Sequence, residues 1–181
     1  MPRLILINGA PGSGKTTIAQ ALAQDHVMTL ALDVDVIKHA LGRWEVDPAA
    51  SGQQARRLSL RVAVEHLDSG FDVVVGQYLA QTPFIESLER TAEEAGATFR
   101  EYVLDLDAAA LAQRLAERAR HPDRPEHGVN NRLVGPADAP ALVQSLEPLH
   151  ASRDRAVWVD ARGSLAATLT LLRAHLDGPT P

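Results

Sequence analysis

The stretch Gly9-Ala-Pro-Gly-Ser-Gly14-Lys15-Thr16 says more about the fold than any other part of this 181-residue chain. It follows the short apolar run Arg3-Leu-Ile-Leu-Ile-Asn8 and precedes a segment of helical character, so it connects a buried strand to a helix. The glycines allow successive backbone N–H groups to point into one concavity, and the first turn of the helix adds partial positive charge. The spacing therefore predicts a loop that holds phosphate groups.

The side chains of this loop predict a nucleotide site that uses a metal ion. Lys15, which we predict to be catalytic, is placed to reach the β- and γ-phosphates, and the Thr16 hydroxyl is placed to ligate Mg²⁺. We therefore predict ATP and Mg²⁺ as cofactors. The predicted nucleotide-binding residues of the loop and the helix start are Gly9, Ala10, Pro11, Gly12, Ser13, Gly14, Lys15, Thr16 and Thr17.

Apolar runs and amphipathic segments alternate along the rest of the chain. This alternation favours a parallel sheet with helices on both faces, which is an α/β fold. No repeat or linker divides the sequence, so residues 1–181 are predicted to form a single domain. The predicted strands are Arg3–Asn8, Val27–Leu32, Phe71–Val75, Thr98–Leu104 and Ala156–Asp160, and the predicted helices are Lys15–Gln24, Val34–Leu41, Pro48–Asp68, Pro83–Ala95, Ala108–Arg120, Ala141–Ser152 and Ser164–Leu176.

Residues 121–140 interrupt this alternation with several prolines and glycines, and the segment is too long for a plain connection. We predict that it is a lid. The helix that leads into it carries Arg114 and Arg118 on one face. Guanidinium groups stay charged and bind phosphate oxygens bidentately. At least one lid arginine is therefore predicted to contact ATP, with Arg114 and Arg118 as the selected residues, Arg118 in a catalytic role, and Arg124 and Arg132 as further candidates.

Two aspartates follow the second predicted strand. The carboxyl ends of parallel strands meet at one edge of a sheet, so Asp33 and Asp35 are expected beside the phosphate loop. A carboxylate there can hold Mg²⁺ through water, or accept the proton of a hydroxyl that attacks the γ-phosphate. The alternative is that Asp35 caps the following helix and Asp33 is a solvated turn residue.

Together these motifs resemble the small P-loop kinases with their AAA-type ATP-binding domain: shikimate kinase, gluconate kinase, chloramphenicol phosphotransferase and the polynucleotide 5′-kinases. Asp33-Val-Asp35 is similar to the Asp-x-Asp of shikimate kinase, in which the first Asp attends Mg²⁺ and the second contacts the substrate hydroxyl. Asp35-Val-Ile-Lys38 resembles the Asp-x-x-Arg of the polynucleotide kinases, in which the Asp is the base. The resemblance implies that Asp35 is the general base and that Asp33 serves the metal with Thr16.

The resemblance also implies a three-layer P-loop NTPase fold, with a five-stranded parallel sheet in the order 2-3-1-4-5 and an Arg-bearing lid. One departure concerns the end of the third predicted strand. Many P-loop NTPases carry an acidic residue there to hold Mg²⁺, whereas this chain has Gly76 and Gln77. Shikimate kinase also has glycine there, within a Gly-Gly-Gly run that this chain lacks. Because this acidic residue is missing, we predict that Thr16 and Asp33 bind Mg²⁺ instead.

The residues predicted to contact the acceptor come from three segments. Gln77 and Tyr78 follow the third strand, and a polar turn before the helix at Pro83 is their alternative interpretation. Arg57 lies on the long predicted helix, where a solvated surface is the alternative. The full set of predicted acceptor-binding residues is Asp35, Lys38, Arg57, Gln77 and Tyr78.

Composition narrows the function further. The 18 basic and 23 acidic side chains give a net charge of −5, and only 4% of residues are aromatic, which disfavours a nucleic-acid partner. No apolar run is long enough to span a bilayer, and the lack of cysteine fits a cytoplasmic protein. We predict a kinase that transfers the γ-phosphate of ATP to a hydroxyl of a small molecule, as a monomer or homodimer without a membrane partner. The alternatives are a polynucleotide 5′-hydroxyl kinase and a nucleotide-binding regulator without phosphotransfer.

Overall fold

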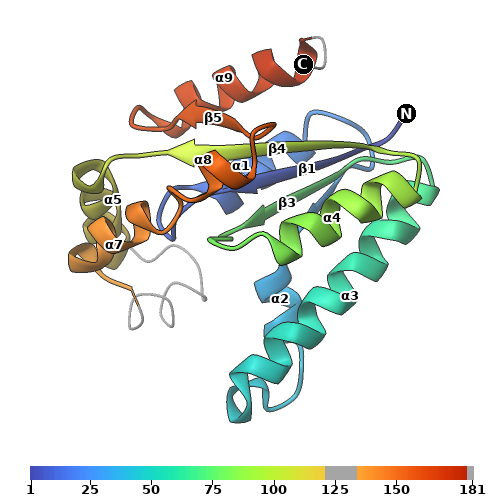
Figure 1. Cartoon of the computed structure of the whole chain (residues 1–181), viewed down its shortest axis with the longest axis horizontal. Coiled ribbons are helices and arrows are strands. Elements are labelled where there is room, and N and C mark those ends of the chain that lie inside the picture. Colours follow the sequence, from blue (N-terminus) through green and yellow to red (C-terminus); the bar gives the residue numbers. More distant parts are fainter. Residues whose placement is uncertain (121–133, 179–181) are drawn as a thin grey trace.

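A five-stranded, all-parallel sheet forms the centre of the molecule in the computed structural model, which describes residues 1–120 and 134–178 (Figure 1). Its order is β2-β3-β1-β4-β5, so the predicted order 2-3-1-4-5 is confirmed. The central strand β1 is buried, because Leu4–Ile7 are all at most 2% exposed. The strands are β1 (Arg3–Asn8), β2 (Leu30–Leu32), β3 (Val73–Gln77), β4 (Thr98–Asp105) and β5 (Val157–Asp160).

Helices cover both faces of this sheet, as predicted (Figure 1). One face packs against α1 (Lys15–Ala23) and α9 (Leu165–Asp177), and the other packs against α3 (Pro48–Asp68) and α4 (Pro83–Glu94). The remaining helices are α2 (Val34–His39), α5 (Ala108–Arg120), α7 (Ala139–Gln144) and α8 (Leu149–Ser152), with short 3-10 turns at Trp44–Val46 and Pro136–Asp138. None of the helices in the described part of the chain combines the length and the apolar character that crossing a membrane requires.

The second and third strands differ from their predicted ranges. The predicted strand Val27–Leu32 is reduced to Leu30–Leu32, since Val27 is 88% exposed and Met28 has a left-handed φ of +61°. These two residues belong to a turn, and their apolar side chains are exposed there. The third strand continues past its predicted end at Val75 to Gln77, and this extension brings Gly76 into the sheet.

The predicted helix Ala141–Ser152 is wrong in extent, because two short helices, α7 and α8, occupy this region. Pro148 separates them, since proline has no N–H to donate and its ring collides with the preceding helical turn. Of the predicted lid, residues 121–133 lie outside the described residues. Its last part is not irregular: a 3-10 turn covers Pro136–Asp138, and α7 already begins at Ala139, where Pro140 is tolerated in the first turn.

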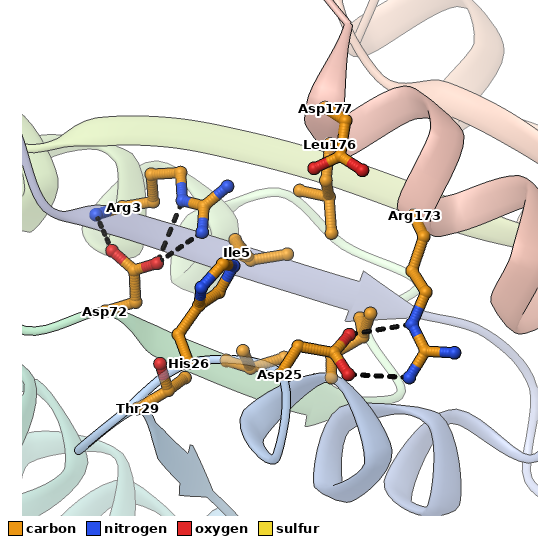
Figure 2. Close-up of a pocket in the computed structure, with 11 residues that line it drawn as sticks. Arg3, Ile5, Asp25, His26, Thr29, Asp72, Arg173, Leu176 and Asp177 are labelled. Atoms are coloured by element: carbon orange, nitrogen blue, oxygen red, sulfur yellow. Dashed lines mark hydrogen bonds and ion pairs between the residues drawn. The ribbon is translucent and has the colours of Figure 1, made fainter.

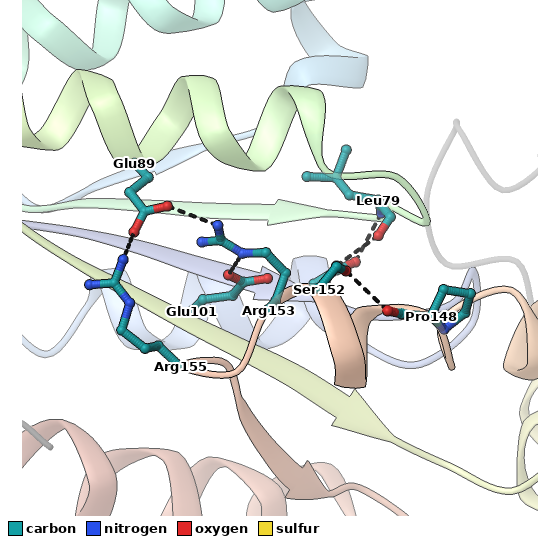
Figure 3. Close-up of polar contacts among 8 residues, drawn as sticks. Leu79, Glu89, Glu101, Pro148, Ser152, Arg153 and Arg155 are labelled. Atoms are coloured by element: carbon teal, nitrogen blue, oxygen red, sulfur yellow. Dashed lines mark hydrogen bonds and ion pairs between the residues drawn. The ribbon is translucent and has the colours of Figure 1, made fainter.

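A buried ionic network fixes the connection from α8 to β5 against the sheet (Figure 3). Glu101 of β4 is 5% exposed, and its Oε2 accepts from Arg153 Nε over 2.8 Å. Arg153 also pairs with Glu89 of α4 over 2.9 Å. Burial raises the pKa of Glu101, while the bond from Arg153 opposes that rise. The network lies away from the phosphate loop, so we assign it a structural role.

Candidate functional site

The loop between β1 and α1 has the backbone shape that its glycines predict. Gly12 and Gly14 have left-handed φ angles of +91° and +93°, which residues with side chains rarely adopt. Ser13 N donates to Ala10 O over 3.0 Å and closes a turn within the loop. A Cβ on Gly12 would lie 2.8 Å from Leu115 Cδ2 of α5. Backbone conformation and packing therefore both require glycine at position 12.

The start of α1 completes a cradle for anionic oxygens. The helix begins at Lys15 directly after Gly14, and its first turn contains no acidic residue. The N–H groups in the first turn of a helix lack partners within the helix, and the helix dipole adds partial positive charge. The Oγ atom of Ser13 is buried and has no hydrogen-bond partner among the described residues. This combination of donors suits phosphate groups.

Lys15 lies among charged side chains from three segments. Loss of hydration in its partly buried position lowers the pKa of Lys15 from 10.5 to about 8. Asp35 and Asp33 act in the opposite direction and raise this pKa, and the positive charge of Arg118 lowers it. The fold therefore places both aspartates and Arg118 within electrostatic range of Lys15.

The two aspartates occupy different positions at the start of α2. Asp33 is the N-cap, and its Oδ1 accepts from the backbone N–H of Asp35 over 2.8 Å. Asp35 lies exposed in the first turn of the helix. The capping bond that the alternative interpretation gave to Asp35 therefore belongs to Asp33. Burial raises the pKa of Asp33, and the hydrogen bond from Asp35 N counteracts this rise.

The missing acidic residue at the end of β3 has a steric explanation. A Cβ on Gly76 would lie 3.1 Å from Lys15 O and 3.2 Å from Thr16 Cα, so the start of α1 fills the space that a side chain would need. Leu32 pairs with Val75 in the parallel register, which places Asp33 beside Gly76. The neighbouring strand thus brings a carboxylate close to position 76, where a side chain would press against the start of α1.

Arg114 and Arg118 of α5 do different things although they share a helix face. Arg114 Nη1 donates to Ser13 O over 2.7 Å, and its Nη2 donates to the carbonyls of Ala161 and Gly163 over 2.5 and 2.6 Å. Arg118 Nη2 lies 3.5 Å from Val134 O, and its charge reaches Lys15. Burial lowers the pKa of both guanidinium groups. The remaining candidates, Arg124 and Arg132, lie outside the described residues.

Gln77 and Tyr78 lie at the carboxyl end of β3, on the same sheet edge as the phosphate loop. The Oε1 atom of Gln77 is buried and has no hydrogen-bond partner within the described part of the chain. The Tyr78 hydroxyl lies 2.8 Å from Ser145 Oγ at the end of α7. Tyr78 therefore links the loop after β3 to the segment that follows residues 121–133.

Lys38 lies in the last turn of α2, and Arg57 lies on α3. Lys38 Nζ stands 4.9 Å from the centre of the Trp44 ring, which is a cation–π distance. His39 packs on the same indole with ring centroids 4.6 Å apart. Arg57 lies on the exposed side of α3. Its neighbour Arg56, which was not among the predicted site residues, holds its guanidinium 5.6 Å from the Phe84 ring at the start of α4.

Asn8 is the site residue that the sequence argument missed. Its side chain is fully buried at the end of β1 and hydrogen-bonds to backbone atoms of Gly9 and Leu79. The signal that could have found it is a polar residue at the end of an apolar run, directly before a phosphate loop. Ser145, the partner of Tyr78, offered no such signal because the sequence does not indicate which strand-end residue it meets.

The cavity shown in Figure 2 lies at the opposite, amino-terminal edge of the sheet and has a volume of about 200 Å³. Its two arginines are each paired with an aspartate: Arg3 with Asp72, and Arg173 with Asp25. None of the predicted site residues lines it. Among residues 1–120 and 134–178, no group of three or more His, Asp or Glu side chains is arranged to hold a resident metal ion.

The family of the chain follows from a match with known sequences. A family model described as an AAA domain matches residues 4–133. The chain belongs to this AAA domain family. The matched range contains the phosphate loop, both aspartates and the arginines of α5. It confirms the resemblance to the small P-loop kinases with their AAA-type ATP-binding domain. No curated protein matches the chain in sequence.

Solved structures of low sequence identity share the fold of this AAA domain. A gluconokinase from Sinorhizobium meliloti 1021 has 22% identity and a TM-score of 0.61, over 97% of this chain and 95% of that chain. The tunicamycin resistance protein of Deinococcus radiodurans has 17% identity and a TM-score of 0.66, over 99% of this chain and 98% of that chain. A chain of the Pnkp1/Rnl/Hen1 RNA repair complex has 16% identity and a TM-score of 0.67, over 83% of this chain and 46% of that chain.

Proposed function

We propose that this AAA domain protein is an ATP-dependent phosphotransferase that moves the γ-phosphate to a hydroxyl of a small molecule. One observation carries the proposal: the charges of Asp33, Asp35 and Arg118, which come from separate segments, act on Lys15 of the phosphate loop. A loop that only bound nucleotide would need no exposed carboxylate beside Lys15. Phosphoryl transfer needs both a cationic cradle and a carboxylate that faces the acceptor.

The nucleotide would be held by the loop from Gly9 to Thr17. Backbone N–H groups and Lys15 would bind the β- and γ-phosphates, and Arg118 would stabilise the charge on the transferred group. Arg114 would act from the other side, because its guanidinium already holds Ser13 O and two carbonyls after β5. Its role would be to fix the phosphate loop and to border the nucleotide.

The oxygen donors of the site fit Mg²⁺, which prefers hydroxyl, carboxylate and water ligands. The Thr16 hydroxyl would ligate the ion directly, and Asp33 would hold it through water. The steric requirement for glycine at position 76 supports this assignment, since Asp33 is the carboxylate beside that position. A bound Mg²⁺ would neutralise charge on the β- and γ-phosphates.

Asp35 would accept the proton of the acceptor hydroxyl. As the acceptor oxygen forms its bond to the γ-phosphorus, the bond from that phosphorus to the β,γ-bridging oxygen breaks, and ADP leaves. Asp35 fits this role because it is exposed and because Asp33, not Asp35, provides the helix cap. Gln77, Tyr78, Lys38 and Arg57 remain the proposed acceptor contacts. The buried, unpaired Oε1 that Gln77 has within the described chain gives it the strongest support of these.

A transfer screen with γ-labelled ATP tests the proposal. Sugar acids, nucleosides, antibiotics and 5′-hydroxyl oligonucleotides would serve as acceptors, with the Lys15→Ala variant as the inactive control. We expect label in a small molecule. Label in the oligonucleotides alone would establish the polynucleotide kinase instead. Saturable ATP binding without transfer to any acceptor would contradict the proposal and favour the regulator.

A further inference from the structure

Asn8 joins two loops at the carboxyl edge of the sheet through its side chain. Its Oδ1 accepts from Gly9 N over 2.8 Å and from Leu79 N over 2.9 Å. Its Nδ2 donates to Leu79 O over 2.9 Å. The residue is 0% exposed, so water does not compete for these bonds. Both lone pairs of the amide oxygen are therefore used, and the arrangement is fully specified.

The bonds continue the sheet beyond the point where its backbone pairing ends. Strand β1 pairs with β3 up to Asn8 and Gln77. Leu79 lies two residues further, in the loop between β3 and α4. The Asn8 amide offers Leu79 the donor and the acceptor that a neighbouring strand would have offered. The bonds thus fix the position of the loop after β3 relative to the phosphate loop.

We propose that Asn8 is a positioning residue that sets the distance between the nucleotide and the acceptor in phosphotransfer. This inference rests on the proposed function, because Gly9 begins the phosphate loop and Leu79 follows the proposed acceptor contacts Gln77 and Tyr78. Reacting atoms must stand about 3–3.5 Å apart, and a displacement of about 1 Å can cost about 10²-fold in rate. One buried amide that binds both loops is a direct way to keep that geometry.

The proposal predicts an effect on turnover that is separate from nucleotide affinity. Asn8→Ala removes all three bonds, while the phosphate loop keeps its internal turn from Ser13 N to Ala10 O and its support from Arg114. We expect kcat to fall by about 10- to 100-fold, with the ATP dissociation constant within about threefold of wild type. Asn8→Asp keeps an oxygen for both N–H donors but cannot donate to Leu79 O. Its kcat should therefore lie between those of the wild type and Asn8→Ala.

A second readout follows communication between the loops without phosphotransfer. Hydrogen exchange of residues 79–82 would be measured with and without adenylyl imidodiphosphate and Mg²⁺. We expect the nucleotide to slow exchange in the wild type and to leave it unchanged in Asn8→Ala. Ser59→Ala is the matched control: Ser59 is also 0% exposed and donates to Ala55 O over 2.8 Å, but it lies in α3, on the face that packs against the core. This control should keep both the kinetics and the nucleotide-dependent exchange.

Each outcome separates this inference from the proposed function. One outcome would overturn the positioning role alone. In it the wild type transfers phosphate, and both Asn8 variants keep the wild-type kcat and the nucleotide-dependent slowing of hydrogen exchange. A parallel loss of kcat and ATP affinity that matches a loss of folded protein would also overturn it, because that pattern is only structural. No transfer by the wild type would refute the proposed function, and the exchange experiment would still decide whether Asn8 couples the loops.

Discussion

Arg114 holds the backbone of Ser13, which lies 101 positions away in the sequence, through a hydrogen bond of 2.7 Å from Nη1 to the carbonyl oxygen. The other terminal nitrogen of the same guanidinium binds the carbonyls of Ala161 and Gly163. One side chain of α5 thus joins the phosphate loop to the connection between β5 and α9. Arg118 contacts a different carbonyl, that of Val134 at 3.5 Å, and its charge also acts on Lys15.

Arg114→Ala is expected to lower both stability and ATP affinity, because three carbonyls lose a charged donor. Hydrogen bonds to charged groups contribute about 1.5–3 kcal/mol each, and with partial exposure we expect a net loss of about 2 kcal/mol in unfolding free energy. Arg118→Ala should lower stability less than Arg114→Ala, and it should lower kcat. Urea denaturation and steady-state kinetics measure both. Arg155→Ala, which removes only an exposed pair with Glu89, is the control. Equal stability of the Arg114 and Arg118 variants would contradict this division.

The pH dependence of ATP binding should report the state of Lys15. The pKa of Lys15 is about 8, and only its protonated form attracts phosphate, so affinity should fall as pH rises through 8. If the neutral form does not bind, the dissociation constant should rise about fivefold between pH 8 and pH 9. Calorimetric titration across this range measures the effect. Lys15→Arg keeps its charge and should flatten the profile, and an equally steep profile in this variant would assign the titration to another group.

Asp35→Asn should separate phosphotransfer from nucleotide binding. Asparagine cannot accept the acceptor proton, and a general base contributes about 10²–10⁴-fold, so turnover should fall by that order. ATP affinity should change little, because the phosphate loop is intact. Asp33→Asn can still cap α2 and should instead weaken the dependence on Mg²⁺.

Rates and ATP dissociation constants at several Mg²⁺ concentrations test the contrast between the two aspartates. Asp47→Asn is the matched control, because Asp47 caps α3 by accepting from Ala50 N over 2.9 Å and lies outside the site. Near wild-type turnover of Asp35→Asn would remove Asp35 from the mechanism and make Asp33 the candidate base.

Gly76→Ala should destabilise the protein and weaken ATP binding together. The added Cβ would stand 3.1 Å from Ala19 Cβ and from Lys15 O, so α1 would have to give way by a few tenths of an ångström. Overpacking of this kind costs about 1–3 kcal/mol. Gly52→Ala in α3 is the control of opposite sign: its Cβ meets nothing within 4 Å, and alanine should stabilise the helix by about 0.5–1 kcal/mol. Unfolding curves and ATP titration measure both variants, and an unaffected Gly76→Ala protein would contradict the packing argument.

Local pattern was sufficient for the fold and for the composition of the phosphate loop. The loop motif, the strand before it and the alternation of strands and helices predicted an all-parallel sheet, and the long helix Pro48–Asp68 was predicted to the residue. The resemblance supplied the strand order, which is confirmed. Local pattern gave wrong element bounds at two places. Val27 and Met28 are apolar but exposed, so the second strand is shorter than predicted, and Pro148 divides the predicted helix Ala141–Ser152.

The sequence by itself determined that a phosphate loop follows the first strand and that two aspartates follow the second, because turn geometry and strand alternation are local properties. Tertiary structure alone decided which arginine holds the phosphate loop and which polar residue joins the two loops. Those assignments depend on contacts between residues far apart in the chain, such as Arg114 with Ser13 and Asn8 with Leu79. Spacing along the sequence carries no information about such contacts, since the packing of helices on the sheet determines them.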